Sequence, residues 1–230
     1  MNILAFDTSS EACTVALLNN ETIFGKTVLN RNTHSANLMP MIDDVLKEAK
    51  LDINEVDYIA CVVGPGSFTG IRIGVSTAKG LAHALNCKCV PLNSIEAIAM
   101  SCSNVKTPIC SALDARSKQV YAGVYKVIDK NIETIIDSNA LHIDEFINKI
   151  NILNLDVTFA GIGSNVNKSN IESNIQNKYK FLDINYPTPD GLINLAKLKL
   201  QNSVDYKSLM PLYLREPQAV RKMKQENSKA

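Results

Sequence analysis

The sequence predicts an α/β protein of two lobes, each built on a βββαβα unit, and three observations support this fold class. Short apolar segments alternate with two longer segments of helical periodicity in the first half of the chain. The order of strands, turns and a strand-ending aspartate then recurs in the second half. Hydrophobic residues make up 46% of the 230 residues, which is enough to bury a core. We expect an N-terminal lobe over residues 1–104 and a C-terminal lobe over residues 105–230.

The first lobe is expected to open with three strands, over Asn2–Phe6, Ala12–Leu18 and Thr22–Val28. Asn19-Asn20 is a suitable hairpin turn between the second and the third. A helix is predicted over Thr33–Lys50, because apolar residues recur there at helical spacing. Thr33 or Ser35 is suited to cap this helix, and Pro40 implies a start near Ser35 or a kink.

The rest of the first lobe reads as a strand, a glycine-rich loop, a helix and a short strand. The strand covers Val56–Val63, the helix covers Thr69–Asn86, and the last strand covers Cys89–Leu92. The loop between the first two is Gly64-Pro65-Gly66-Ser67-Phe68-Thr69-Gly70-Ile71-Arg72-Ile73-Gly74. Glycines before a helix allow positive φ, and the free N–H groups of a helix start attract anions. A bound nucleotide or phosphate is one interpretation of this loop.

The loop departs from both familiar phosphate-binding patterns. No Lys-Ser/Thr pair follows Gly70, as a Walker loop requires, and the third glycine comes one residue late for a dinucleotide fingerprint. A tight turn from strand to helix therefore explains the segment equally well.

The second half repeats the first at a measurable offset. The segment Ile109–Asp114 ends in an aspartate as the first strand does at Asp7, and 114 − 7 = 107. The next predicted strand, Tyr121–Tyr125, lies at the same offset from Thr14–Leu18. Later, Gly161-Ile162-Gly163-Ser164 echoes the glycine loop at an offset of 161 − 64 = 97. These echoes predict a duplicated unit that is shorter in its second copy.

A duplicated βββαβα unit of this kind resembles the actin-like, Hsp70-like and sugar-kinase (ASKHA, ribonuclease H-like) fold. In that superfamily the first-strand aspartates face a cleft between the lobes, where nucleotide and metal bind. The resemblance makes the following residues candidate nucleotide or phosphate contacts: Asp7, Thr8, Ser9, Gly64, Gly66, Ser67, Arg72 and Asp114. Turn capping by short polar side chains, and an arginine that braces the loop, are the alternatives that need no ligand.

Composition limits the functions that remain. The net charge is +1 and the pI about 7.6, so we expect no contact with tRNA by this chain alone. No apolar run reaches the ~18 residues that span a bilayer, and the chain is expected to be cytoplasmic. The six cysteines and three histidines lack metal-ligand spacing, which predicts reduced, structural cysteines and no intrinsic metal.

Several motifs together are similar to the bacterial TsaB (YeaZ) family of tRNA threonylcarbamoyladenosine machinery. They are Ile3–Ser9, Thr33-His34-Ser35, the loop Gly64–Gly74, Asp114-Ala115-Arg116 and Pro211-x-Tyr213-Leu214-Arg215. They span the chain, although the stretch from about Ile128 to Leu209 carries none. The resemblance implies a subunit that pairs with its relative TsaD, helps to recruit the ATPase subunit TsaE, and forms a homodimer when alone.

Comparison with TsaD implies that this lobe lacks a metal site. TsaD carries Asn-His-x-Glu-Gly-His, with two histidines four residues apart, where this chain reads Asn93-Ser94-Ile95-Glu96-Ala97-Ile98. Isoleucine has no lone pair, and Glu96 alone cannot replace two imidazoles. We therefore expect no catalytic residues of its own and no intrinsic cofactor, with ATP or ADP at the subunit interface left open.

The family resemblance implies that the first two helices meet their counterparts in TsaD. On the second helix, small residues repeat every four positions and form a ridge that another helix could approach. The first helix carries an apolar stripe broader than one buried face needs. The expected interface residues are Leu38, Met41, Ile42, Val45, Leu46, Gly70, Gly74, Ala78 and Ala82. The alternative is that both helices simply cover the sheet of their own lobe.

Three functions are compatible with these features. The first is a non-catalytic scaffold that supports threonylcarbamoyl transfer to the adenosine beside the anticodon, with tRNA contacted only through the complex. The second is an ATP-dependent kinase or ATPase of the actin-like superfamily. The third and weakest is a peptidase. The tail from Arg215 to Ala230 has a basic excess and is interpreted as a solvated terminus or as a contact to tRNA phosphates in the complex. Its basic residues are Arg215, Arg221, Lys222, Lys224 and Lys229.

Overall fold

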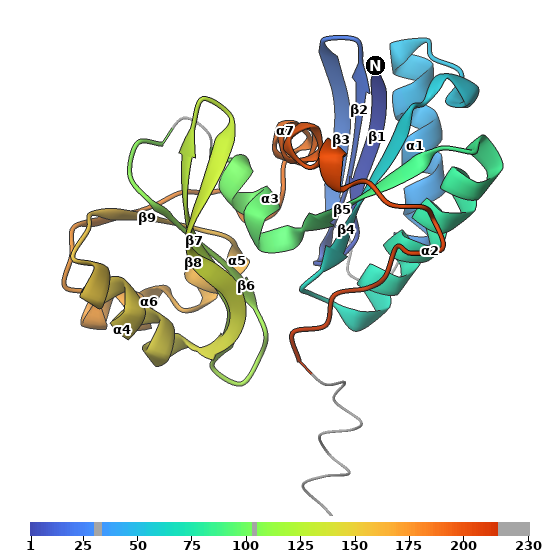
Figure 1. Cartoon of the computed structure of the whole chain (residues 1–230). Helices are drawn as coiled ribbons and strands as arrows, with labels where there is room; N and C mark the ends of the chain where they lie inside the picture. Colours follow the sequence, from blue (N-terminus) through green and yellow to red (C-terminus); the bar gives the residue numbers. More distant parts are fainter. Residues whose placement is uncertain (30–33, 103–104, 216–230) are drawn as a thin grey trace, which may run out of the picture.

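Each lobe is built on a five-stranded mixed sheet, and the computed structural model describes residues 1–29, 34–102 and 105–215 (Figure 1). The first sheet has the strand order β3-β2-β1-β4-β5. Its strands are β1 Asn2–Asp7, β2 Ala12–Asn19, β3 Thr22–Leu29, β4 Tyr58–Gly64 and β5 Lys88–Asn93. Strands β1 to β3 pair antiparallel, whereas β4 and β5 are joined in parallel. The strands predicted for this lobe are confirmed.

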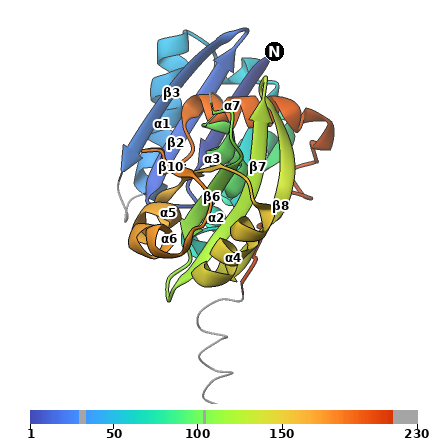
Figure 2. The same cartoon turned by 90° about the vertical axis from the view of Figure 1, so that its left-hand side faces the viewer.

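The second sheet repeats this arrangement in the order β8-β7-β6-β9-β10. Its strands are β6 Ile109–Asp114, β7 Gln119–Ile128, β8 Asn131–His142, β9 Val157–Ala160 and β10 Tyr179–Phe181. Strand β6 pairs antiparallel with β7 and parallel with β9, as β1 does with β2 and β4. Figure 2 looks onto this lobe and shows the long β7 and β8 side by side. The predicted duplication of the unit is therefore confirmed.

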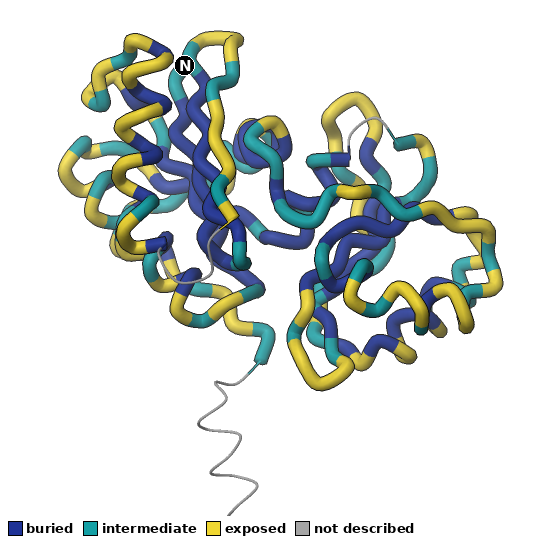
Figure 3. Tube along the Cα trace, turned by 180° about the vertical axis from the view of Figure 1, so that it is seen from behind, coloured by how far each residue is buried: buried dark blue, intermediate teal, exposed yellow. Residues whose placement is uncertain are grey.

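Helices cover both faces of the first sheet. Helices α1 His34–Ala49 and α2 Phe68–Leu85 lie on one face, and α3 Ser94–Met100 and α7 Pro189–Leu198 lie between the two sheets (Figure 1). Because side chains of a strand alternate between faces, Leu4 and Phe6 pack under α1 and α2, while Ile3 and Ala5 join the core around α3 and α7. Burial in Figure 3 follows these layers, with the strands dark blue and the outer helices banded.

The second lobe is covered by shorter helices. They are α4 Ile143–Leu153, α5 Ile162–Val166 and α6 Lys168–Asn174, and two 3-10 turns, η1 Ile53–Glu55 and η2 Leu200–Asn202, complete the described elements. Helix α4 buries Phe146 and Ile150 against this sheet. Among the described residues, every helix is too short or too polar to span a bilayer.

The predicted helix ends are close to those of the structure. Helix α1 begins at His34, next to residues 30–33, so the proposed cap Thr33 lies outside the described residues. The helix continues through Pro40, which is exposed. Helix α2 is capped by Ser67, whose side chain accepts a hydrogen bond from the Gly70 N–H at 3.3 Å. The C-terminal cap Asn86 is left-handed, with φ of 52°.

The predicted division at residue 105 is wrong for the end of the chain. Helix α7 packs on β1, β2 and β3 of the first lobe. After it, Val204 bridges to Cys89 of β5, and Leu209 is buried in the core beneath α1 and α2. The chain therefore crosses to the second lobe after α3 and returns to the first before α7, because the second sheet is complete at β10.

The small-residue ridge of α2 does not face a partner. Gly70, Gly74, Ala78 and Ala82 are all buried within the chain. A Cβ added at Gly74 would lie 2.6 Å from Thr8 Oγ1, so the small residues allow α2 to lie close to the chain's own first lobe. The predicted use of these four residues as an interface is corrected accordingly.

The apolar stripe of α1 is also turned inward. Its members are less than 9% exposed and belong to the core under α1 and α2: Leu38, Met41, Ile42, Val45 and Leu46. Helix α1 packs against β2 and β3 of the sheet and also against α2. Its buried surface is therefore wider than packing on the sheet alone would need. This accounts for the breadth of the stripe without a partner. Ile42 and Leu46 also line a surface hollow, so a part for α1 in an interface stays a prediction.

Candidate functional site

A cleft of about 630 Å³ lies between the two lobes. The first lobe supplies the Ser9–Glu11 turn and the start of α2, and the second supplies the β6–β7 turn. Four of the eight predicted contacts line it: Ser9, Gly66, Ser67 and Asp114. Thr8, Asp7, Gly64 and Arg72 do not. The two strand-ending aspartates therefore lie near one cleft, as the resemblance implied, although only one of them reaches its wall.

The glycine loop is packed tightly against the turn that follows β1. The Ser67 N–H donates a hydrogen bond to the Ser9 carbonyl at 2.6 Å. A Cβ at Gly66 would lie 2.2 Å from the same carbonyl oxygen, which excludes any larger residue there. Gly64 has a φ of +131° and is joined to Pro65 by a cis peptide bond. Close packing thus accounts for these glycines, and a phosphate contact by the loop stays a prediction.

Asp7 ends β1 as a buried carboxylic acid. Its Oδ1 accepts a hydrogen bond from the Ser9 N–H at 2.7 Å, whereas Oδ2 has no hydrogen-bond partner within the part of the chain that the structure describes. Burial raises the pKa of Asp7, and hydrogen bonding from Ser9 and the nearby His34 oppose this only in part. The adjacent Thr8 hydroxyl donates to the Gly70 carbonyl at 2.7 Å and so fixes the turn on α2.

The raised pKa of Asp7 predicts a pH-dependent gain from Asp7→Asn. An acid whose pKa is raised on folding stabilises the fold below its unfolded pKa and loses that contribution as pH rises through the folded value. Asparagine keeps an acceptor for Ser9 and never ionises. We expect Tm to rise by about 2–4 °C at pH 8, the shift that ~1 kcal/mol gives in a chain of this size, and the gain to shrink toward pH 4.

Differential scanning calorimetry from pH 4 to pH 8 measures this effect. Asp114→Asn is the matched control, because Asp114 occupies the equivalent strand end but is exposed. A gain for Asp7→Asn that is the same at every pH would contradict the proposed cause.

Asp114 has a different environment from Asp7. Its Oδ1 accepts a hydrogen bond from the Arg116 N–H at 2.9 Å and closes a turn of the kind that short polar side chains favour. After Ala115, three consecutive residues have positive φ: Arg116 at 63°, Ser117 at 54° and Lys118 at 57°. Consecutive left-handed conformations are costly for residues other than glycine. This β6–β7 turn is therefore a strained segment at the cleft wall.

Arg72 braces the C-terminal motif. Its Nε donates a hydrogen bond to the Tyr213 hydroxyl at 3.0 Å, and its guanidinium lies 3.8 Å from the centre of the Phe68 ring. Tyr213 stacks on Phe68 with ring centres 4.8 Å apart. Of the two interpretations given for Arg72, the structure supports loop bracing, and Tyr213 is the partner that sequence spacing did not reveal.

The residues that stand in place of the TsaD histidines are engaged inside the chain. The Ser94 hydroxyl donates to the Pro65 carbonyl at 2.5 Å, and Ile98 is fully buried in the core around α3 and α7. Glu96 Oε2 lies 2.9 Å from Lys199 Nζ in a partly buried ion pair. Over residues 1–29, 34–102 and 105–215, no three His, Cys, Asp or Glu side chains group as metal ligands.

The cysteines and histidines have structural surroundings. Five cysteines are buried and Cys87 is half-buried; burial raises the pKa of Cys102 to about 12, so this thiol stays neutral and unreactive near neutral pH. The Nε2 of His34 donates to the Ser10 carbonyl, and His142 caps α4. His83 lies on α2 against the ring of Tyr206. All three histidines thus lie at the end of a helix.

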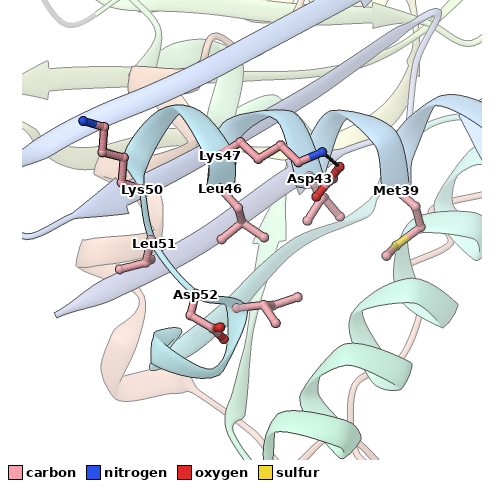
Figure 4. A pocket seen from close by; sticks show the side chains of 9 residues that line it. Met39, Asp43, Leu46, Lys47, Lys50, Leu51 and Asp52 are labelled. Atoms are coloured by element: carbon pink, nitrogen blue, oxygen red, sulfur yellow. Dashed lines mark hydrogen bonds and ion pairs between the residues drawn. The ribbon is translucent and has the colours of Figure 1, made fainter.

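A second hollow of about 350 Å³ lies on the outer side of α1, beside the turn that follows it. Figure 4 shows Met39 and Leu46 pointing toward this hollow, with Leu51 and Asp52 on its far side. Met39 is 46% exposed, and Lys47 forms an ion pair with Asp43 along the rim. We call this hollow the α1 groove. It is lined by Met39, Ile42, Asp43, Leu46, Lys47, Lys50, Leu51, Asp52 and Ile53.

Comparison with known proteins places the chain. The TsaD family model, tRNA N6-adenosine threonylcarbamoyltransferase, matches residues 27–223. The tRNA threonylcarbamoyladenosine biosynthesis protein TsaB of Bacillus subtilis is 31% identical over 224 residues, covering 95% of this chain and 96% of that protein. The Haemophilus influenzae protein of the same name is 38% identical over 123 residues, 53% of this chain and 52% of that protein.

Two further comparisons concern the fold and a related transferase. YeaZ from Pseudomonas aeruginosa has a TM-score of 0.80 at 27% identity, covering 93% of this chain and 99% of that one. A tRNA N6-adenosine threonylcarbamoyltransferase of Prosthecochloris aestuarii is 31% identical over 112 residues, 42% of this chain and 32% of that protein. The resemblance carried by the sequence motifs is confirmed, and the chain belongs to the TsaB (YeaZ) family.

Proposed function

We propose that this chain is a non-catalytic subunit of a tRNA threonylcarbamoyladenosine-forming complex, and that it acts by pairing with a TsaD-type transferase. Similarity to TsaB of Bacillus subtilis over 95% of the chain carries the pathway assignment. In the proposal, TsaD transfers the threonylcarbamoyl group to the adenosine beside the anticodon, TsaE joins the pair, and tRNA is held by the complex. ATP or ADP binds, if at all, at the boundary between subunits.

The surroundings of Ser94 and Ile98 support a non-catalytic role. Ile98 is fully buried, and the Ser94 hydroxyl is committed to the Pro65 carbonyl. The lone carboxylate between them, Glu96, is neutralised by Lys199. Chemistry that depends on imidazole ligands in TsaD therefore has no counterpart at these positions of this lobe.

The α1 groove supports pairing with a related chain. Most of the apolar surface of α1 and α2 is buried in the chain's own core, so pairing must use the side of α1 that borders the groove, where Ile42 and Leu46 meet the surface. TsaD shares sequence with this chain and is expected to carry an equivalent α1, which would allow the two helices to meet in a nearly symmetric way. The groove rim carries both charge signs, in Asp43, Asp52, Lys47 and Lys50, as a self-complementary surface requires. A homodimer of the isolated chain would use the same surface.

Reconstitution tests the proposed function. Purified chain, TsaD, TsaE, ATP, the threonylcarbamoyl donor and tRNA are mixed, and modified adenosine is measured by mass spectrometry with each protein omitted in turn. We expect modification to require this chain, and the chain alone to release no phosphate from ATP. ATP turnover by the chain alone would support the kinase or ATPase alternative instead, and full modification without it would overturn the proposal.

The same assay tests the basic tail. Residues 216–230 lie outside the described residues, and the sequence leaves a tRNA contact open. Deleting the chain after Glu216 and measuring the initial rate of modification against intact chain decides between the two interpretations. A frayed terminus predicts an unchanged rate, whereas contacts to tRNA phosphates predict a loss that is largest at low salt and shrinks as the salt concentration rises.

A further inference from the structure

The last described segment of the chain runs back along the first lobe and ends beside the second. Figure 1 shows it in red, leaving α7, passing α2 and ending between the lobes. Val204 exchanges backbone hydrogen bonds with Cys89 at 2.8 and 2.9 Å, and the Lys207 carbonyl accepts one from the Lys79 ammonium. Leu209 is 1% exposed. We call residues 203–215 the strap.

The strap is anchored most tightly at the glycine loop. The Leu212 N–H donates a hydrogen bond to the Val63 carbonyl at 2.7 Å, which adds the strap to the end of β4. A Cβ on Gly64 would lie 2.3 Å from the Leu212 carbonyl oxygen, so the glycine makes room for the strap. One residue later, Tyr213 stacks on Phe68 and accepts the hydrogen bond from Arg72. Each contact belongs to the first lobe.

Two residues further on, the strap reaches the other lobe. The Arg215 Nη1 donates a hydrogen bond to the Ala115 carbonyl at 2.5 Å. Ala115 belongs to the β6–β7 turn, which holds the three left-handed residues Arg116, Ser117 and Lys118. A charged donor on a carbonyl is stronger than a neutral one, and strained turns persist only where neighbouring groups hold them.

We propose that the strap latches the two lobes together across the mouth of the cleft, with Arg215 as the latch and Tyr213 as its anchor. Both residues line the cleft and join its two walls. Elsewhere the lobes are connected through α3 and α7, and Asn93 at the end of β5 donates a hydrogen bond to Ser138 of β8 at 2.9 Å. The latch fixes the separation of the walls and holds the β6–β7 turn in its strained conformation. Release of the strap would open the cleft.

Hydrogen–deuterium exchange of the isolated, full-length chain tests the latch. The amides to follow are those of Ala115, Arg116 and Gln119, whose hydrogen bonds close the β6–β7 turn. We expect Arg215→Ala to speed their exchange about tenfold, the factor that corresponds to one charge-assisted hydrogen bond. Amides in the later turns of α4, over residues 147–153, should exchange as in the wild type, because only the first residue of this helix, Ile143, bonds to the turn, at the Lys118 carbonyl.

Tyr213→Ala tests whether Tyr213 positions Arg215 or only stabilises the first lobe. Although Tyr213 touches only the first lobe, its loss should speed exchange in the β6–β7 turn of the second lobe to the same extent. The double variant Tyr213→Ala/Arg215→Ala should then exchange no faster there than either single variant, because both act through one contact. Lys207→Ala, which removes another cation from the strap, is the matched control and should leave the turn unchanged.

The outcomes that overturn the latch are distinct. If the turn amides of Arg215→Ala exchange at the wild-type rate, the hydrogen bond from Arg215 to Ala115 does not stabilise the β6–β7 turn. Faster exchange throughout the chain, with a matching fall in Tm, would show a general loss of stability in its place. The measurement needs no TsaD, TsaE or tRNA, so its result is independent of the proposed function.

Discussion

Ala78→Arg should abolish folding of this protein, with loss of the soluble monomer and of any cooperative thermal transition. Ala78 lies in the middle of α2 with 0% of its surface exposed, in the core shared with α1 and the first sheet. An arginine there would place a long side chain in a filled space and remove its charge from water. Overpacking costs about 1–3 kcal/mol and an unpaired buried charge several more. The total stability of a typical domain is only about 5–15 kcal/mol.

Ala84→Arg is the control for this result. Ala84 lies on the same helix and is exposed, so the substitution has the same size and charge and should change Tm by less than about 2 °C. Circular dichroism against temperature and the yield of soluble monomer measure both variants. An Ala78→Arg chain that melts with the wild type would mean that α2 turns this residue outward, and would restore the interface predicted from the sequence.

The positions of the strands along the chain were predicted well, because the sequence patterns that identify strands and turns are local. Alternating apolar residues identify β1 and β2, the Asn19-Asn20 turn joins β2 to β3, and the repeated aspartate reveals the second lobe. These features depend on neighbours within a few residues. The segment from β8 to α7 carries weaker patterns and no family motif, and apart from the echo of the glycine loop at Gly161–Ser164 its elements were not predicted.

The orientation of α1 and α2 required the structure. A helical stripe of small or apolar residues shows that one side is covered, but not what covers it. For Gly74 the answer is Thr8, which lies 66 residues earlier in the chain. The same limit applies to the return of the chain at α7, since no local pattern records which lobe a helix packs against.

The candidate site was predicted in part for the same reason. Ser9 follows β1 and Asp114 ends the equivalent strand β6, so duplication alone brings them to one cleft. Asp7 was expected on that cleft too, but its side chain is buried behind the turn. The contacts of Phe68 with Tyr213 and of Ala115 with Arg215 join residues more than 90 positions apart, and no spacing rule in the sequence indicates them.

The α1 groove gives the proposed pairing its sharpest test. Met39→Glu should weaken binding to TsaD at least tenfold, because a carboxylate would have to lose its water in an apolar part of the interface, and tenfold corresponds to only ~1.4 kcal/mol. Met39 is 46% exposed on a helix, and glutamate is a good helix former, so the fold should keep its Tm within about 2 °C. The initial rate of tRNA modification should fall with binding.

Ile152→Glu is the matched control, since Ile152 is 82% exposed at the end of α4 in the second lobe. It makes the same apolar-to-acid change on a helix surface far from the groove, and should leave binding intact. Titration calorimetry with purified TsaD compares the two variants with the wild type. Equally weakened TsaD binding in both variants would show that the added negative charge, and not the position of Met39 in the groove, is the cause. Wild-type binding by Met39→Glu would remove the α1 groove from the pairing surface, because a buried carboxylate in a close-packed helix contact cannot be neutral in energy.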